Sequence, residues 1–394
     1  MKSDQLERAF HSADPDVRRQ AVHRMSLRPQ GTPLAQVLEA LSDDDWRVRR
    51  EAIALAAAQT ADRQALVDEL IARVVSTDNI GLRNAAIEVL GMIGQGQSEK
   101  FEAACKTAGP SGRKFLVEAM GKTRDPQMVS NLEDVLRGDD ANAAAAAVEA
   151  LVRIGGSRAE ELLREQLATT DLFLRISVVE GLTRLGTHVP WSELAPAVDD
   201  AIVRRISAEL LGRTGDSQAL EFLLDLATDA SPQTSSAALR AISTLARQAE
   251  SDREEITERL AASTDSFRLA IHEALLHGDT PTRQGASYLA VLCRDDSSLE
   301  AVLHAVADDV VGPEVIESLR SWGPRLIDAL LMFHSGEPRV WAVALQLAAE
   351  LTDRYSADVS PGVRDRVRGL IERNLIDAPE EVKAAAAESL RWWG

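Results

Sequence analysis

Residues 82–94 read Leu82-Arg83-Asn84-Ala85-Ala86-Ile87-Glu88-Val89-Leu90-Gly91-Met92-Ile93-Gly94. Their apolar side chains recur at intervals of three and four, which places them on one face of an amphipathic helix. A helical pattern over residues 65–75 precedes this segment, and Ser76-Thr77-Asp78-Asn79 between them offers N-cap side chains. Gly94 follows as a stop signal, a role that we also expect of Gly155, Gly186 and Gly215. The pattern predicts a helical hairpin whose second helix carries Glu88.

The same pattern returns along the chain at intervals of 29 to 34 residues. We call the place of Glu88 in each copy the marker position; it falls at residues 23, 54, 88, 118, 149, 180, 209, 240 and 273. A period of this length is typical of solenoids, in which each hairpin buries its apolar face against its neighbours. The sequence therefore predicts an all-α, right-handed α-solenoid of stacked helical hairpins. We expect about nine regular units over residues 1–280 and a less regular helical C-terminal lobe over residues 281–394 that caps them.

The composition supports closely packed helices and excludes several classes of protein. Of 394 residues, 45% are hydrophobic and only 4% aromatic, so Ala and Leu must fill most of the core. The formal net charge is −18, which opposes nucleic acid as a general partner. The first residues are charged, and no window has the roughly 18 apolar residues of a membrane span, so we expect a cytoplasmic protein. Cys105 and Cys293 are predicted to be buried thiols rather than a redox or metal pair.

Three stretches carry a family resemblance. Residues 14–22, 45–53 and 82–91 resemble the second helices of bacterial HEAT repeats, including the HEAT-like units of phycobilin lyases. The resemblance covers residues 1 to about 280 and implies that the second helices line a concave surface. It indicates the fold and leaves the function open, because this architecture serves many tasks.

The strongest functional feature is a row of carboxylates at the marker position. On the helical wheel, Glu88 points away from the apolar face, and the resemblance places its equivalents along the inner wall. With packed helices about 8–10 Å apart, five such groups form a track of roughly 40 Å. We predict that this row binds a basic segment or face of another protein. Its members are Glu88, Glu118, Glu149, Glu180 and Glu209.

A structural explanation of the same row competes with recognition. A cation stands four residues after four of these glutamates, the favourable spacing for an ion pair within one helix. These cations are Lys122, Arg153, Arg184 and Arg213. Glu is also a good helix former on a solvated surface, so solvation and repeat ancestry together would account for the row without a partner. A second row stands five positions before the marker, and we expect it to pair with Asp in neighbouring turns and so tie adjacent units together. It comprises Arg18, Arg49, Arg83, Arg113, Arg175, Arg204 and Arg268.

Enzymatic motifs receive no support from the residues. His272 and His277 are five positions apart, which leaves their side chains about 140° apart on a helix and unsuited to a shared metal. We therefore expect no metal or cofactor and no catalytic residue. The predicted function is a non-enzymatic protein-binding scaffold or adaptor. Two alternatives stay open: an accessory or lyase-like maturation subunit of an enzyme, and a HEAT-like DNA glycosylase or other nucleic-acid-binding protein. The partner and the oligomeric state are not defined by the sequence.

Overall fold

The computed structural model describes residues 3–59, 62–214, 216–248 and 252–393. Within these ranges the backbone forms 25 α-helices and seven short 3-10 helices and no β-strand, which confirms the predicted all-α fold. The chain divides into two compact units, Met1–Thr187 and His188–Gly394, and each is described by itself. This division is separate from the predicted loss of repeat regularity after residue 280, which stays a prediction.

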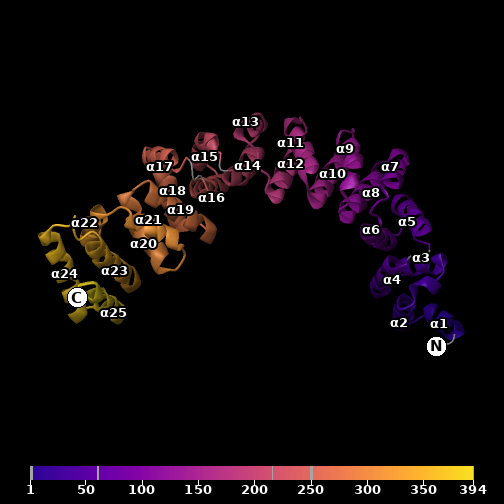
Figure 1. Cartoon of the computed structure of the whole chain (residues 1–394), viewed down its shortest axis with the longest axis horizontal. Helices are drawn as coiled ribbons and strands as arrows, with labels where there is room; N and C mark the ends of the chain where they lie inside the picture. Colours follow the sequence, from indigo (N-terminus) through magenta and orange to yellow (C-terminus); the bar gives the residue numbers. More distant parts are fainter. Residues whose placement is uncertain (1–2, 60–61, 215, 249–251, 394) are drawn as a thin grey trace. The chain divides into compact units, whose positions relative to one another are not determined.

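The first unit is a stack of helical hairpins (Figure 1). The first helices of the hairpins are α1 (Ser3–Phe10), α3 (Leu34–Leu41), α5 (Arg63–Ser76), α7 (Ser98–Thr107), α9 (Val129–Leu136) and α11 (Ser157–Glu165). The second helices are α2 (Pro15–Ser26), α4 (Trp46–Ala58), α6 (Ile80–Ile93), α8 (Pro110–Thr123), α10 (Ala141–Ile154) and α12 (Leu172–Leu185). Short 3-10 helices lie at η1 (Pro29–Gly31), η2 (Pro126–Met128) and η3 (Gln166–Ala168). Each helix pair packs together, and each second helix packs against the next one, so the unit is the solenoid that the sequence predicts.

The two helices of each hairpin belong to different layers of the first unit. The second helices form the inner side of the curve that this unit follows, and the first helices form its outer side (Figure 1). We call these the inner layer and the outer layer. The core lies between them and includes Leu55, Leu90, Phe101, Leu116 and Leu151, all fully buried. Leu and Ala dominate this core, as the low aromatic content predicts.

Capping side chains set where the inner-layer helices begin. The carboxylates of Asp14, Asp45, Asp140 and Asp171 and the amide of Asn79 each accept a hydrogen bond from a backbone N–H in the first turn of the following helix. In α8 the N-cap is Gly109, which has no side chain for this bond. The marker position stands nine residues after each of these caps. This constant spacing therefore gives the marker residues of successive helices one register.

The predicted glycine stops differ in conformation. Gly155 and Gly186 end α10 and α12 with φ of 71° and 70°, a region that glycine enters without steric cost. Gly94 follows α6 with φ of −83°, so it ends the helix without a left-handed turn. Gly215 lies outside the described residues.

The second unit is also all-helical. Its α-helices are α13 (Trp191–Leu194), α14 (Ala201–Thr214), α15 (Leu220–Ala227), α16 (Pro232–Gln248), α17 (Arg253–Ala261), α18 (Asp265–His277), α19 (Thr280–Leu292), α20 (Leu299–Ala307), α21 (Pro313–Arg320), α22 (Pro324–Met332), α23 (Pro338–Arg354), α24 (Pro361–Ile376) and α25 (Glu380–Ser389). Its 3-10 helices are η4 (Ala195–Ala197), η5 (Ser217–Ala219), η6 (Asp296–Ser298) and η7 (Leu390–Trp393). Helices predicted beyond residue 280 are therefore present.

The prediction that residue 273 is the ninth marker position is wrong. Residue 273 lies on α18, which forms a hairpin with α19, and it is α19 that packs along α16. Two helices, α17 and α18, stand between α16 and α19 where the other repeats have one. The interval of 33 residues that leads to Glu273 is therefore not a repeat of the same helix. Tyr288, nine residues after the N-cap Asp279, takes the marker position of α19 and is buried.

Candidate functional site

Four of the five predicted glutamates lie on consecutive inner-layer helices of the first unit. Glu88 is on α6, Glu118 on α8, Glu149 on α10 and Glu180 on α12. The first, third and fourth are exposed, and Glu118 is half-buried. Because each glutamate stands nine residues after its N-cap residue and neighbouring helices lie about 8–10 Å apart, the carboxylates form one row along the inner layer. Glu209 is exposed on α14 of the second unit.

Cations from the following repeat neutralise two members of this row. Lys122 on α8 forms an ion pair with Glu88 on α6. Arg184 on α12 donates to Glu149 on α10 at 2.6 Å, and this hydrogen bond raises the pKa of the guanidinium. The predicted pairing within one helix is therefore wrong for Lys122 and Arg184, because both reach back to the preceding helix. It is confirmed only on α14, where Arg213 Nη2 lies 3.0 Å from Glu209 Oε1.

The remaining positions of the row are open. Glu118 and Glu180 make no ion pair with any residue that the structure describes, and neither does the exposed Arg153. The two neutralised carboxylates are themselves accessible, since the side chains of Glu88 and Glu149 are each 48% exposed. Ion pairs with this exposure contribute about 0–1 kcal/mol and weaken with salt. These two ion pairs therefore contribute little to stability.

Two glycines of the inner layer lie where adjacent helices approach each other closely, and one of them, Gly91, lies between the helices that carry Glu88 and Lys122. A Cβ added at Gly121 of α8 would stand 2.7 Å from the Ala150 Cα on α10. A Cβ at Gly91 of α6 would stand 2.8 Å from the Lys122 Cβ on α8. Real Cβ atoms do not approach so closely, so only glycine permits this separation of the helices.

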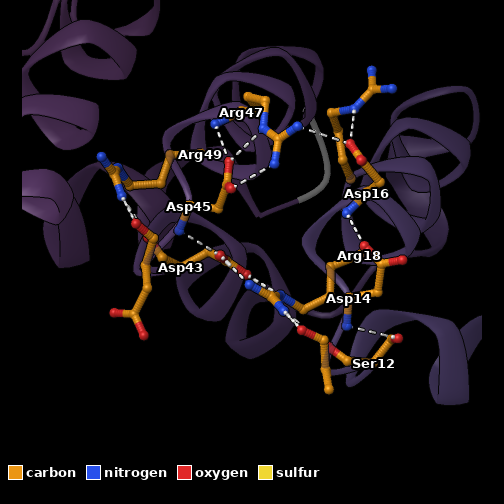
Figure 2. Close-up of polar contacts among 11 residues, drawn as sticks. Ser12, Asp14, Asp16, Arg18, Asp43, Asp45, Arg47 and Arg49 are labelled. Atoms are coloured by element: carbon orange, nitrogen blue, oxygen red, sulfur yellow. Dashed lines mark hydrogen bonds and ion pairs between the residues drawn. The ribbon is translucent and has the colours of Figure 1, made fainter.

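The first two repeats are joined by a network of alternating charges, which we call the Arg–Asp network (Figure 2). It comprises Asp16 and Arg18 from α2, Asp43 and Asp45 from the turn before α4, and Arg47 from α4. Arg18 binds Asp43 through two parallel bonds, Nε to Oδ2 at 2.7 Å and Nη2 to Oδ1 at 2.9 Å. Arg47 binds Asp45 within its own repeat and reaches Asp16 of the preceding one at 3.1 Å. The predicted tie between adjacent units is therefore confirmed here, with the bidentate geometry that guanidinium and carboxylate favour.

Elsewhere the arginine row contacts backbone carbonyls more often than acids. Arg204 does pair with Asp225 at 2.6 Å. Arg49 instead donates to the carbonyls of Asp43 and Asp44, and Arg175 donates to that of Thr169. These carbonyls belong to the turn at the C-terminal end of the preceding helix, where acceptors lack partners within the helix. The sequence contains a signal for this role, because each arginine stands four residues after a cap and so close to the turn.

Two carboxyl groups of the Arg–Asp network, those of Asp43 and Asp45, have pKa values below their usual range. Hydrogen bonds from Arg47 lower the pKa of Asp45 to about 2. Burial alone would raise the pKa of Asp43, but hydrogen bonds from Arg18 and from the Asp45 N–H outweigh it and the net shift is downward. A carboxyl whose folded pKa is depressed stabilises the fold above its unfolded pKa, about 3.9, and this contribution is lost as the pH falls through the folded pKa.

We therefore expect the contact between the first two repeats to weaken between about pH 4 and pH 2. Hydrogen exchange of α2 and α4 measured across this range should show falling protection. Asp43→Asn should lower the free energy of unfolding at neutral pH by about 1–2 kcal/mol, because it removes the charge from a pair whose side chains are only 20% and 12% exposed. The same variant should show a smaller loss of protection on acidification. An unchanged pH profile in Asp43→Asn would refute the role of this pair.

The cysteines and the two histidines of α18 are the other candidates for reactive or metal-binding residues. Both cysteines are buried, which confirms the prediction of buried thiols, and burial raises the pKa of the Cys105 and Cys293 thiols to about 11 each. His277 lies 3.7 Å from Glu273 on its own helix. In the described part of the chain, His, Cys, Asp and Glu side chains form no group of three that could hold a metal ion. Across the same ranges, no helix has the length and apolar character needed to cross a membrane.

Comparison with known proteins agrees with this architecture. The profile of the family described as HEAT repeats matches residues 3–91, 34–107 and 98–183. No curated protein matches the chain. Among solved structures, importin beta in a polyethylene glycol condition is 14% identical, with a TM-score of 0.49 over 99% of this chain and 59% of that one. A structure from a study of the interaction between cadherin and beta-catenin is 13% identical, with a TM-score of 0.42 over 98% and 99%. An engineered protein is 16% identical, with a TM-score of 0.38 over 99% and 98%.

These comparisons give no support to the closer resemblance to phycobilin lyases or to a bacterial origin. The family profile agrees with the helix pairs of the first unit. Residues 3–183 of this all-α chain are HEAT repeats, stacked as a solenoid of helical hairpins.

Proposed function

We propose that this protein is a non-enzymatic scaffold or adaptor that binds another protein along the inner layer of its repeats. The observation that carries this proposal is the row of marker residues on α6, α8, α10 and α12, which stands at one register on four consecutive helices. A row of this kind presents evenly spaced groups on a supported surface. Such a surface suits an extended segment or a broad protein face, because each repeat can contribute one contact.

The row also suggests the chemistry of the partner. Glu118 and Glu180 are open to a basic group, and the ion pairs of Glu88 and Glu149 are exposed enough to exchange. A partner with Lys or Arg at intervals similar to the helix spacing would find an acceptor on each repeat. Attraction of this kind depends on salt, because exposed charges are screened beyond about 10 Å at 0.1 M ionic strength.

One observation favours an anionic partner instead, such as an acidic protein or a nucleic acid. On the inner-layer helices α2, α4, α6, α8, α10 and α12, Lys and Arg outnumber Asp and Glu by 13 to six. Several of these cations belong to the arginine row, whose members bind turn carbonyls or Asp. We therefore place the basic partner first and keep the anionic partner as the second candidate.

Neutralising the row should separate these candidates. We expect Glu118→Gln, Glu149→Gln and Glu180→Gln combined to weaken binding of a labelled oligolysine peptide roughly tenfold at low salt, since three exposed pairs are lost. Fluorescence anisotropy at low and high salt measures the effect, and affinity capture from the native cell shows whether a natural partner responds in the same way. The difference should shrink as salt rises.

The control neutralises three glutamates of the outer layer instead. Glu39→Gln, Glu69→Gln and Glu102→Gln on α3, α5 and α7 change the net charge by the same amount, and all three side chains are accessible to solvent. Equal weakening by both triple variants would mean that net charge, and not the row, attracts the peptide. Unchanged or stronger capture of the natural partner by the inner-layer variant would refute the basic partner, and stronger capture would support the anionic one.

A further inference from the structure

A cavity of about 190 Å³ opens in the first unit beside α7, α8 and α9 and the turn before α10. Its lining combines apolar and charged side chains. The residues used here are Cys105, Arg113, Asp134, Val135, Gly138 and Asp140. The cavity lies away from the row of marker glutamates, none of which lines it.

The cavity occupies the place that a carboxylate takes beside Arg18. Arg18 and Arg113 stand at equivalent positions, each five residues before its marker. The carboxylate that binds Arg18 comes from the second repeat, where Asp43 stands two residues beyond the end of α3. The residue two beyond the end of α9 is Gly138, so Arg113 faces no side chain from that position.

The guanidinium of Arg113 is left with unused donors. Among the described residues it makes two hydrogen bonds, both of 3.3 Å, from Nε to the Cys105 carbonyl and from Nη2 to the Ala108 carbonyl. Arg18 makes shorter bonds to its carboxylate in addition to its bonds to the turn. A guanidinium can donate five N–H groups and binds carboxylates in a fork, so Arg113 is ready to receive an anionic oxygen pair.

Asp140, which also lines the cavity, carries an acceptor without a partner. Asp140 Oδ1 accepts two backbone N–H groups at 3.1 Å and caps α10. Its second oxygen, Oδ2, is buried and has no hydrogen-bond partner. A buried acceptor without a donor is unfavourable, so an ammonium group beside it would relieve that cost.

The rest of the lining defines the ligand further. Burial raises the pKa of the Cys105 thiol to about 11, so it is uncharged at neutral pH and forms an apolar surface together with Val135. Glu102 is paired with Lys106, and the exposed Asp134 adds a second carboxylate. The site therefore offers a cation, at least one free carboxylate oxygen and an apolar surface.

We propose that this cavity binds a small zwitterion of the α-amino acid class with an apolar side chain. The ligand carboxylate binds Arg113 in the place that Asp43 takes at Arg18, and its ammonium group binds Asp140 Oδ2. A cavity of about 150 Å³ accommodates benzene, so one somewhat larger accommodates a molecule of about eight heavy atoms, the size of valine. This inference does not depend on the scaffold function, because the two sites share no residue.

Titration calorimetry of the full chain with three probes tests the proposal. L-valine has both charged groups, L-valinamide lacks the carboxylate and N-acetyl-L-valine lacks the ammonium. We expect L-valine to bind and each analogue to bind at least about tenfold more weakly, the loss of one charge-assisted hydrogen bond. No binding of L-valine at millimolar concentration would overturn the proposal. Equal binding of L-valinamide would overturn the role of Arg113, and equal binding of N-acetyl-L-valine would overturn that of Asp140.

Gly138→Asp provides the matching variant. It is designed to restore a carboxylate opposite Arg113, and the position is not in the left-handed region of φ, although the added Cβ would lie 3.3 Å from the Val135 carbonyl oxygen. We expect this variant to lose L-valine binding while its circular dichroism is unchanged. Gly31→Asp, which adds the same side chain where nothing lies within 4 Å, should bind L-valine as the wild type does. Full binding by Gly138→Asp would place the ligand elsewhere and overturn the assignment.

Discussion

Leu90→Asp is expected to unfold several consecutive repeats of the first unit. Leu90 is fully buried on α6, and α6 packs against α4, α5 and α8. The substitution places a carboxylate where no donor or cation can reach it, and burial of an unpaired charge is among the few changes that cost more than about 4 kcal/mol. Because each repeat is stabilised chiefly by its neighbours, loss of α6 removes the support of the helices on both sides.

Hydrogen exchange with mass spectrometry measures how far this loss extends. Protection should fall across α4, α5, α6 and α8 together. Asn84→Asp is the matched control, because it adds the same charge to the exposed side of α6 and should change the free energy of unfolding by no more than about 0.5 kcal/mol. Loss of protection confined to the hairpin of α5 and α6 would contradict a shared core.

Gly121→Ala and Gly369→Ala are expected to change stability in opposite directions. Both glycines lie inside helices, where Ala is favoured over Gly by about 1 kcal/mol. At Gly369 on α24 an added Cβ meets nothing within 4 Å, so the helix preference alone acts and the variant should gain roughly 1 kcal/mol. At Gly121 the added Cβ meets the Cα and Cβ of Ala150 at 2.7 and 2.9 Å.

The clash at Gly121 involves the backbone of α10, so α8 and α10 must move apart. Overpacking of this kind costs about 1–3 kcal/mol, and we expect a net loss of about 2 kcal/mol after the gain in helix preference. Urea unfolding of both variants against the wild type measures the two changes. A gain in stability at Gly121 would show that the inner-layer helices are not held as close as the structure places them.

Much of the fold can be predicted from the sequence because it depends on local patterns. The apolar spacing of residues 82–94 defines α6, and Asn79 defines where that helix begins. The repeat interval extends this interpretation to eight marker positions. It fails at residue 273, because two helices separate α16 from α19 and nothing in the spacing reveals which of them packs in the inner layer.

The candidate site is less predictable because its contacts cross between repeats. The pairing of Lys122 with Glu88 depends on the separation of α6 and α8, which Gly91 permits. The spacing along α8 predicts that Lys122 pairs with Glu118, because spacing within one helix carries no information about the distance to the neighbouring helix. The cavity at Arg113 depends on the absence of a carboxylate at residue 138, which becomes visible only when the turns of different repeats are superimposed.

The ties that join consecutive repeats have a consequence for protein engineering and for the growth of such arrays. Arg18 pairs with Asp43 of the next hairpin, and Arg184 pairs with Glu149 of the preceding one, so at these junctions each of the two hairpins supplies one partner of the ion pair. Excising or inserting a single hairpin therefore creates a junction between partners that do not correspond. Shortened or lengthened versions of this protein should tolerate changes best where the two new neighbours carry a matching acid and base.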